Sequence, residues 1–224
     1  MKKLALLSAV AVSSAALLGG ANAFAATDSN NATQSETPVT ATFTLPDGGG
    51  TNPTPPGGGD GDNTDNELPT EWGIAYQPTT FNFGTTQLKE SGEQVVPATK
   101  KSSFNVGVKD KTRGTKGWTL KASLQWQGDA IEGAKITTTG DGTVNINKGE
   151  DVLEPVTDEV TGQSNVEIKS GSESLIMTGA DGVRHNSVYD YDLGDVSLHL
   201  ADAGKVEGKS YNGKVVWNLT ATPE

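Results

Sequence analysis

Four kinds of side chain in this 224-residue sequence could take part in catalysis or ligand binding. They are the carboxylates, two histidines, a run of basic residues and four tryptophans. The histidines, His185 and His199, are fourteen residues apart among predicted strands, and this spacing matches no metal-ligand motif. Asp190 and Asp192 flank Tyr191, so a pair of glycosidase carboxylates stays open as an alternative. The sequence has no Gly-x-Ser-x-Gly, phosphate-binding loop or His-Glu-x-x-His motif. We therefore expect a protein that is not an enzyme and has no catalytic residues.

One acidic stretch partly copies a calcium-binding loop. Asp60 to Asp65, with Glu71 in the twelfth position, resembles the loop of an EF-hand. The sixth position is Asp65, where that loop requires glycine, and no helix is predicted on either side. The sequence also lacks cysteine, which excludes disulfides, thiolate metal sites and cysteine nucleophiles. We therefore expect no metal ion and no other cofactor.

Basic residues gather between Lys100 and Lys121, although the formal net charge of the chain is −11. They are Lys100, Lys101, Lys109, Lys111, Arg113, Lys116 and Lys121. This run could bind carboxylates or phosphates of an anionic polymer, or it could be an ordinary solvated segment. Arg113 is the strongest candidate in it, because a planar guanidinium can hold a carboxylate with two hydrogen bonds, although it could equally bond Asp110. The acidic balance of the whole chain argues against a nucleic-acid partner.

Two stretches that contain tryptophan and leucine alternate strictly between apolar and polar residues. Between Trp118 and Trp126 the even-numbered residues are apolar and the odd-numbered residues are polar, which predicts a half-buried strand. The pattern returns in residues 215–221. The rings on these faces could stack on a glycan or bind a partner, or they could line a core. The continuation of each face as Leu, Ala and Val favours the core.

We expect these two stretches to be neighbouring strands with one joint site. Their apolar residues would organise the site, and their polar neighbours would contact the ligand. The organising residues are Trp118, Leu120, Trp217 and Leu219, and the contacting residues are Thr119, Lys121, Asn218 and Thr220, together with Arg113.

The remaining elements are predicted to be short strands and turns, with no helix of any length. The predicted strands span 73–76, 81–83, 94–96, 104–109, 118–126, 135–138, 143–147, 166–168, 174–177, 189–193, 196–200 and 214–220. Asn212-Gly213 before the last strand is a signal for a type I′ hairpin. Many short strands at regular spacing predict an all-β fold, a β-sandwich that is immunoglobulin-like or related.

The front of the chain has the composition of exported proteins. Two lysines, an apolar run and small residues predict a signal peptide over residues 1–25, cleaved after Ala25 or after Ala23. Residues 26–67 are rich in Pro, Gly, Asp, Ser and Thr, which predicts a mobile linker. Within it, residues 39–45 alternate like a strand that could add to the domain edge or stand alone. Residues 68–224 are predicted to form the domain.

Three motifs resemble those of the WxL family of Gram-positive surface proteins. Asp110 to Leu120 is close to the family pattern D-x-R-G-T-x-x-G-W-x-L, with one extra residue before Arg113. Phe81-Asn82-Phe83-Gly84 is similar to the F-x-F-G element of the family, and Trp217-Asn218-Leu219 provides the second Trp-x-Leu. Single Trp-x-Leu triplets occur by chance, whereas two copies in these contexts are specific. The resemblance covers roughly residues 39–224.

The resemblance implies a secreted protein of the cell surface that attaches non-covalently to the cell wall by binding peptidoglycan. It also implies surface complexes with other WxL proteins and with membrane-anchored WxL-interacting proteins, and a role in adhesion. The basic run would then meet stem-peptide carboxylates or the phosphates of teichoic acid. Non-covalent attachment agrees with Leu68-Pro69-Thr70-Glu71, where Trp72 stands in place of the glycine of a sortase signal. The alternative is a protein-interaction subunit or adhesin that binds another surface protein or a host protein.

Overall fold

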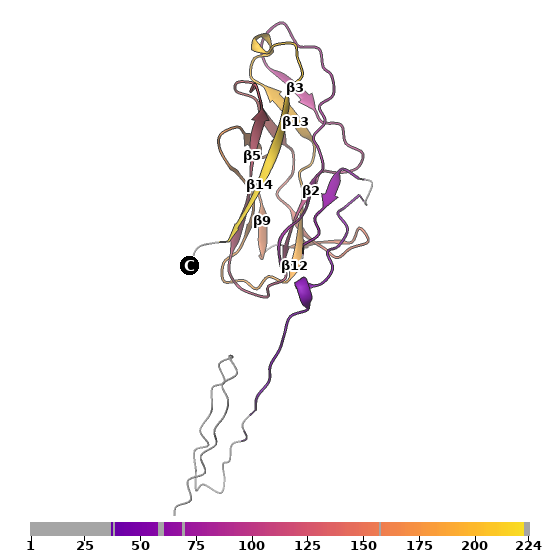
Figure 1. Cartoon of the computed structure of the whole chain (residues 1–224), viewed down its shortest axis with the longest axis vertical. Coiled ribbons are helices and arrows are strands. Elements are labelled where there is room, and N and C mark those ends of the chain that lie inside the picture. Colours follow the sequence, from indigo (N-terminus) through magenta and orange to yellow (C-terminus); the bar gives the residue numbers. More distant parts are fainter. Residues whose placement is uncertain (1–36, 38, 58–60, 69, 157, 222–224) are drawn as a thin grey trace, which may run out of the picture. The chain divides into compact units, whose positions relative to one another are not determined.

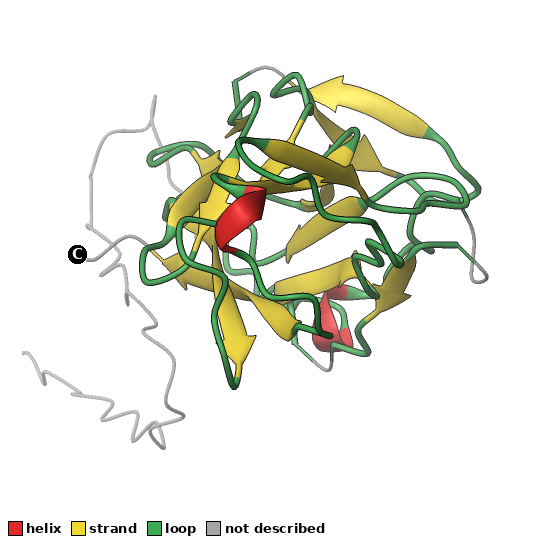
Figure 2. Cartoon of the chain, turned by 90° about the horizontal axis from the view of Figure 1, so that it is seen from above, coloured by secondary structure: helices red, strands yellow, loops and turns green. Residues whose placement is uncertain are grey.

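The structure is a computed structural model that describes residues 37, 39–57, 61–68, 70–156 and 158–221. The chain divides into two compact units, 1–44 and 45–224, and the first is described only at 37 and 39–44. The predicted signal peptide, 1–25, lies outside the described residues. The second unit consists of strands joined by loops, with two short 3₁₀ helices, η1 (Asp47–Gly49) and η2 (Ala203–Lys205) (Figures 1 and 2). The predicted all-β fold is confirmed.

The strands form three antiparallel sheets. The first sheet has the order β1-β2-β4-β12-β7-β8, the second β10-β6-β13-β3 and the third β14-β5-β11-β9. The strands of the first sheet are β1 (Asn63–Asp65), β2 (Trp72–Pro78), β4 (Asn105–Asp110), β12 (Ser187–Asp192), β7 (Val144–Asn147) and β8 (Leu153–Val156). Those of the second are β10 (Glu167–Lys169), β6 (Lys135–Thr138), β13 (Val196–Leu200) and β3 (Gln94–Pro97). Those of the third are β14 (Asn212–Ala221), β5 (Trp118–Gln127), β11 (Ser174–Gly179) and β9 (Val160–Gly162).

One hydrophobic core joins the three sheets into a sandwich. Only residues 193–195 separate β12 from β13, so the chain passes directly from the first sheet to the second. Both of these sheets face the third sheet across the core. The buried residues include Val106, Val108, Tyr189 and Tyr191 from the first sheet, Ile136 and Val196 from the second, and Trp118, Leu120, Ala122 and Ile176 from the third.

The alternation of side chains predicted most of these strands, but β1, β8 and β9 were not predicted, and two further details were wrong. Residues 81–83 do not form a strand, and there only Asn82 makes an isolated bridge, to Thr99. The predicted hairpin at Asn212-Gly213 is absent, because both residues lie inside β14 and pair with Gln127 and Trp126. Gly213 is required there for space, since a Cβ at this position would lie 2.9 Å from the carbonyl oxygen of Gln125.

Residues 45–57 and 61–67, which we call the strap, lie against the first sheet. Pro55 and Pro56 are buried, and β1 within the strap pairs with β2. The compact unit therefore begins at Leu45, so the predicted boundary at residue 68 and the predicted mobile linker are wrong for the strap.

A buried amide fixes the strap where composition alone predicts mobility. Asn63 Nδ2 donates to the carbonyl oxygens of Pro56 and Ser103, at 3.2 and 3.0 Å. Its Oδ1 accepts from the backbone N–H of Asn105 at 2.8 Å. The strap is thus ordered by hydrogen bonds to the sheet, and these compensate for the small apolar area that its sequence offers.

The described residues 39–44 of the first unit contain no strand. Val39 and Phe43 are 83% and 91% exposed, and no described strand pairs with the segment 39–45. The expected strand is therefore not formed in this structure, because its apolar face has no sheet to cover.

Substituting Gly107 tests the packing of the strap side of the first sheet. Gly107 lies on β4 opposite Tyr76, and a Cβ there would lie 2.4 Å from the tyrosine ring. We expect Gly107→Ala to lower the free energy of unfolding by about 1–3 kcal/mol, because the buried ring must move. Gly208→Ala is the matched control, since its Cβ would meet open space. Denaturant unfolding of both variants checks the difference, and equal stabilities would contradict the packing described.

Candidate functional site

The two Trp-x-Leu strands are neighbours, as the sequence predicted. β5 and β14 pair over ten residues, with Leu120 opposite Leu219 and Ala122 opposite Trp217. Trp118 is 1% exposed and packs on His185 and Tyr189, with both pairs of ring centroids 6.1 Å apart. Because Leu120 is also fully buried, neither residue is placed to contact a ligand. For these two residues the core interpretation holds.

Trp217 and Leu219 differ from their partners because β14 is the edge strand of the third sheet. Both side chains pack against the core but stay half-buried. Trp217 also borders an open cleft. The two Trp-x-Leu triplets therefore have different roles, one inside the sandwich and the other at its edge.

The predicted contact residues lie on the opposite face of the same sheet, away from the tryptophans. Asn218 Nδ2 donates to Glu173 Oε1 at 2.7 Å, and Lys121 Nζ lies 3.5 Å from Glu173 Oε2. The hydrogen bond from Asn218, and then the charge of Lys121, lower the pKa of Glu173. Thr119 lies in a row of threonines across the four strands, with Thr220, Thr178 and Thr161 in register. The predicted joint site is thus divided between two faces.

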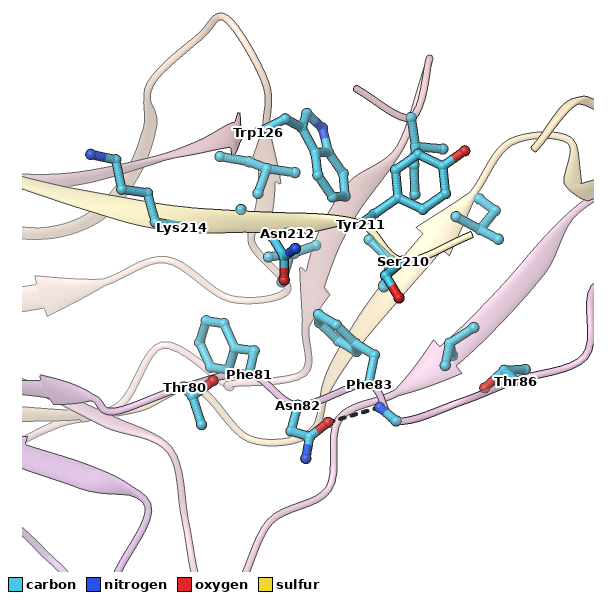
Figure 3. A pocket seen from close by; sticks show the side chains of 18 of the residues that line it. Thr80, Phe81, Asn82, Phe83, Thr86, Trp126, Ser210, Tyr211, Asn212 and Lys214 are labelled. Carbon is cyan, nitrogen blue, oxygen red and sulfur yellow. Dashed lines mark hydrogen bonds between the residues drawn. The ribbon is translucent and has the colours of Figure 1, made fainter. Parts of the chain in front are cut away.

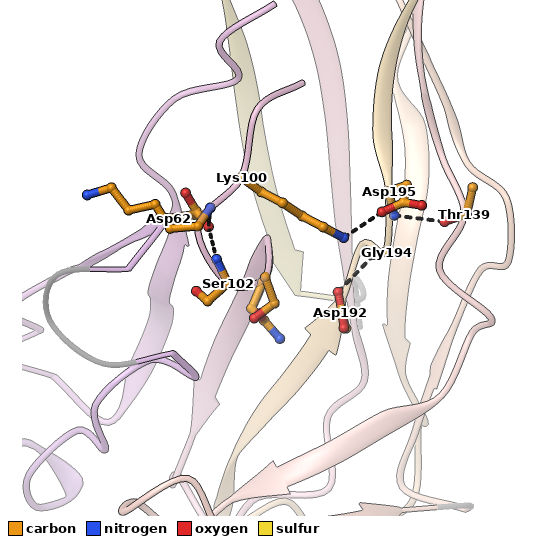
Figure 4. A network of polar contacts seen from close by, with 10 residues as sticks. Asp62, Lys100, Ser102, Thr139, Asp192, Gly194 and Asp195 are labelled. Carbon is orange, nitrogen blue, oxygen red and sulfur yellow. Dashed lines mark hydrogen bonds and ion pairs between the residues drawn. The ribbon is translucent and has the colours of Figure 1, made fainter. Parts of the chain in front are cut away.

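The basic run does not form one surface. Lys100 Nζ bonds Asp195 Oδ1 at 2.5 Å, near the turn where Asp195 N–H donates to Thr139 (Figure 4). Lys109 is fully buried under the strap, and its Nζ donates to the carbonyl oxygen of Gly50 at 3.0 Å. Lys109 lies on β4 and Lys121 on β5, whereas the other basic residues of the run lie in the loops before and after β4.

Arg113 lies in an exposed loop beyond β4. Its φ angle is 57°, its backbone N–H donates to His185, and its carbonyl oxygen accepts from Arg184. The Asp110 carboxylate accepts from the backbone and hydroxyl of Thr112, which is how this loop is held. The sequence alternative, in which Asp110 pairs with Arg113, is therefore not what the structure shows.

A cleft of about 920 Å³ opens at the side of the sandwich where β14 and β3 are edge strands (Figure 3). Its walls are residues 78–86 and 88 on one side and residues 206–215 and 217 on the other. Five aromatic residues line it: Phe81, Phe83, Trp126, Tyr211 and Trp217. Its polar side chains include Thr80, Asn82, Thr86, Ser210, Asn212 and Lys214.

Both walls of the cleft are fixed by local contacts. Phe81 packs edge-on against the buried Phe104, with ring centroids 5.0 Å apart. Asn82 Oδ1 accepts from the N–H of Gly84 at 2.9 Å, and Gly84 has a φ of 63°, which favours glycine. This bond holds the Phe-x-Phe-Gly element locally, and Phe83 lines the cleft. Its function as a wall of the cleft was not predicted.

The opposite wall depends on Tyr211. Its ring meets Trp126 at a centroid distance of 6.3 Å, and Lys209 Nζ lies 5.5 Å from the tyrosine ring centroid. Lys209 is held by Asp129 and Glu207, both at 2.7 Å, and these hydrogen bonds raise its pKa. The pairing of Gly213 with Trp126 brings Tyr211 to this position.

Aromatic walls with hydroxyl and amide groups at the rim suit an uncharged polar ligand with apolar faces, such as a sugar ring. The carboxylate pair considered from the sequence is not available for such a ligand, because Asp190 is fully buried. His185 is also buried, and His199 pairs with Glu93. Within the described ranges, no three metal-ligating side chains are grouped, and no helix has the length and apolarity to cross a membrane.

Comparison with known proteins gives one result. Residues 29–223 match the family described as WxL domain surface cell wall-binding. No curated protein and no solved structure matches the chain. The family match covers most of the sequence, including both Trp-x-Leu strands, the Phe-x-Phe-Gly element and the strap. The chain therefore belongs to the WxL family of surface cell-wall-binding proteins.

Proposed function

We propose that this protein attaches to the wall without a covalent bond by binding peptidoglycan, and that the cleft holds a segment of the polymer. The observation that carries the proposal is the convergence of five aromatic residues from three separated parts of the chain on one open cleft. Buried aromatics such as Trp118 are explained by the core, whereas Phe83, Trp126 and Tyr211 border an open space.

The chemistry of a glycan strand fits such a cleft. Sugar rings have apolar C–H faces that pack on aromatic rings, and hydroxyl and acetamido groups that bond to amides and hydroxyls. A volume of 920 Å³ is within the range of roughly 300–1,000 Å³ for small-molecule sites, so it accommodates a few sugar units. Asn82, Ser210 and Asn212 lie where they can bond such groups.

In this proposal the Trp-x-Leu strands mainly position the residues that line the cleft. Trp118 and Leu120 fix β5 in the core, and the register of β14 on β5 sets the places of Trp217 and Tyr211 in the cleft. The predicted contact residues Thr119, Lys121, Asn218 and Arg113 lie on other surfaces, and the control variant of the same experiment tests Thr119 and Asn218.

Loss of the cleft aromatics should weaken wall binding. We expect the double variant Trp126→Ala/Tyr211→Ala to bind protein-free sacculi at least about tenfold more weakly, because two rings each contribute about 1 kcal/mol or more. The measurement is a pull-down over a range of sacculus concentrations, with and without teichoic acid. The matched control is Thr119→Ala/Asn218→Ala on the opposite face of the sheet, and circular dichroism checks that all variants fold.

Each outcome has a distinct meaning. Equal binding by the cleft variant would contradict the cleft as the site, and a loss confined to the control would assign binding to the outer face. Binding that requires teichoic acid would identify the anionic polymer as the ligand. Failure of the folded wild-type protein to bind sacculi would favour the alternative of a subunit whose ligand is another surface-complex protein or a host protein.

A further inference from the structure

β14 has the properties of a strand that lacks a neighbour. It lies at the edge of the third sheet and, among the described strands, pairs only with β5. Exposed edges present rows of unpaired N–H and C=O groups, and proteins usually protect them with proline or charged residues. β14 spans ten residues without proline, and Lys214 is its single charged residue. Its edge is therefore open to another strand.

The apolar face beside this edge is also incompletely covered. Val215, Trp217 and Leu219 pack against the core but remain half-buried, whereas Leu120 and Ala122 on β5 are fully buried. A further strand beside β14, with apolar side chains on this face, would cover them as β14 covers β5.

Residues 39–45 have the matching pattern. Their apolar residues alternate with threonines, and the segment has no charge, glycine or proline. Val39 and Phe43, at 83% and 91%, are the most exposed large hydrophobic residues of the described chain. Such a sequence is typical of a strand with one buried face. In this structure that face is not buried.

Residues 39–45 match residues 215–221 of β14 in length, and both have one apolar face and one polar face. Seven residues in strand conformation span about 23 Å, the length of residues 215–221. With its apolar side toward Trp217 and Leu219, the segment places three threonines on the other face. That face already carries the row of Thr220, Thr119, Thr178 and Thr161.

The strap favours a second copy as the source of this strand. Gly49 packs on the first sheet, where its Cβ would lie 3.0 Å from Lys111, and Lys109 bonds the carbonyl oxygen of Gly50. Leu45 is four residues away, a reach of about 14 Å at most. β14 belongs to the opposite layer, and sheet spacing alone takes about 10 Å before the chain crosses the width of the sandwich. A second copy has no such tether.

We propose that residues 39–45 of one copy pair with the edge of β14 in a second copy, as a fifth strand of its third sheet. Each copy has one segment and one edge, so the contact is head-to-tail and links copies into chains. The strand uses the 215–221 half of β14. Trp217 borders both this strand and the cleft, whereas Phe83, Trp126 and Tyr211 lie toward the Asn212 end, so the variant Trp126→Ala/Tyr211→Ala tests wall binding without changing the paired half of β14.

Crosslinking tests the pairing directly, because the chain has no cysteine of its own. Thr42 and Asn218 are the central residues of the two segments, so they are close in either strand direction. We expect full chains carrying Thr42→Cys and Asn218→Cys, when mixed with a bis-maleimide, to form heterodimers. Thr161→Cys, on the far edge of the same sheet, should give only background crosslinking. Absence of the heterodimer would overturn the proposal.

A chain that carries both cysteines distinguishes the source of the strand. When diluted, it should crosslink between copies in proportion to concentration. Crosslinking only within single chains would overturn the proposal, because the strand would then come from the same copy.

Self-association provides the second measurement. We expect Phe43→Ser to raise the dissociation constant of full-chain assembly at least about tenfold, measured by sedimentation equilibrium, because a buried phenylalanine is lost. Thr42→Ser, on the other face, should leave assembly unchanged. Phe43 is exposed within its own copy, so the variant keeps its fold. Wild-type protein that stays monomeric, or variants that assemble equally, would contradict the pairing.

Discussion

Trp118→Ala is expected to lower the free energy of unfolding by about 3–5 kcal/mol, the cost of removing a large buried aromatic side chain. Trp118 is 1% exposed and contacts the rings of His185 and Tyr189. Gly179 on β11 leaves the space that the indole ring occupies, since a Cβ at position 179 would lie 2.4 Å from this ring. Denaturant unfolding with a constant m-value measures the loss.

Trp217 provides the comparison within the same protein. Because it is half-buried at an open edge, Trp217→Ala should cost about 1–2 kcal/mol, clearly less than Trp118→Ala. Trp118→Phe should recover part of the lost stability by refilling the cavity. Equal costs for the two alanine variants would contradict the division of the Trp-x-Leu triplets into a core residue and an edge residue.

A buried carboxylate should make the stability of the domain depend on pH. Asp190 is fully buried on β12, where it accepts hydrogen bonds from Tyr76 at 2.8 Å and from Asn105 at 3.0 and 3.1 Å. Burial raises the pKa of Asp190 to about 7, and the charge of Asp192 adds to this, while the hydrogen bonds oppose it. The folded protein therefore holds the proton more tightly than the unfolded chain.

The sign of the effect follows from that difference. The stabilisation that the protonated Asp190 adds to the free energy of unfolding is fully present below about pH 4. It falls as the pH rises toward 7 and is absent above pH 7. One pKa unit corresponds to about 1.4 kcal/mol, so the total change is about 4 kcal/mol. Asp190→Asn should remove this decline, whereas the exposed Asp192→Asn should change stability by less than about 1 kcal/mol. Unfolding curves between pH 4 and pH 8 measure both, and parallel profiles for wild type and Asp190→Asn would disprove the effect.

The sequence predicted the elements whose side chains alternate over many residues. Such alternation specifies both the strand and its buried face. The shared Trp-x-Leu pattern also led to the prediction that β5 and β14 are neighbours, which is confirmed. It could not separate Trp118 from Trp217, because both have the same local pattern. Their burial differs through the sheet order, which places β14 at an edge.

The strap and the cleft depend on contacts between distant residues. Asn63 orders the strap through Ser103 and Asn105, some forty residues away, while the composition of the strap predicts mobility. Trp126 and Tyr211 are likewise far apart in the sequence and meet because of the β5–β14 register. The resemblance of residues 81–84 to a family element pointed to this region without identifying its role.

The order of the strands along the chain has a consequence for biosynthesis. β5 ends at Gln127, long before β14 begins at Asn212. The longest strand pairing of the domain therefore cannot form until the last strand has been synthesised. Until then β5 is itself an edge, and the apolar face around Trp118 has no stable cover on that side. Contacts this distant in sequence form slowly, and unpaired edges aggregate. A chain interrupted before β14 would therefore be prone to aggregation and a ready substrate for chaperones and proteases.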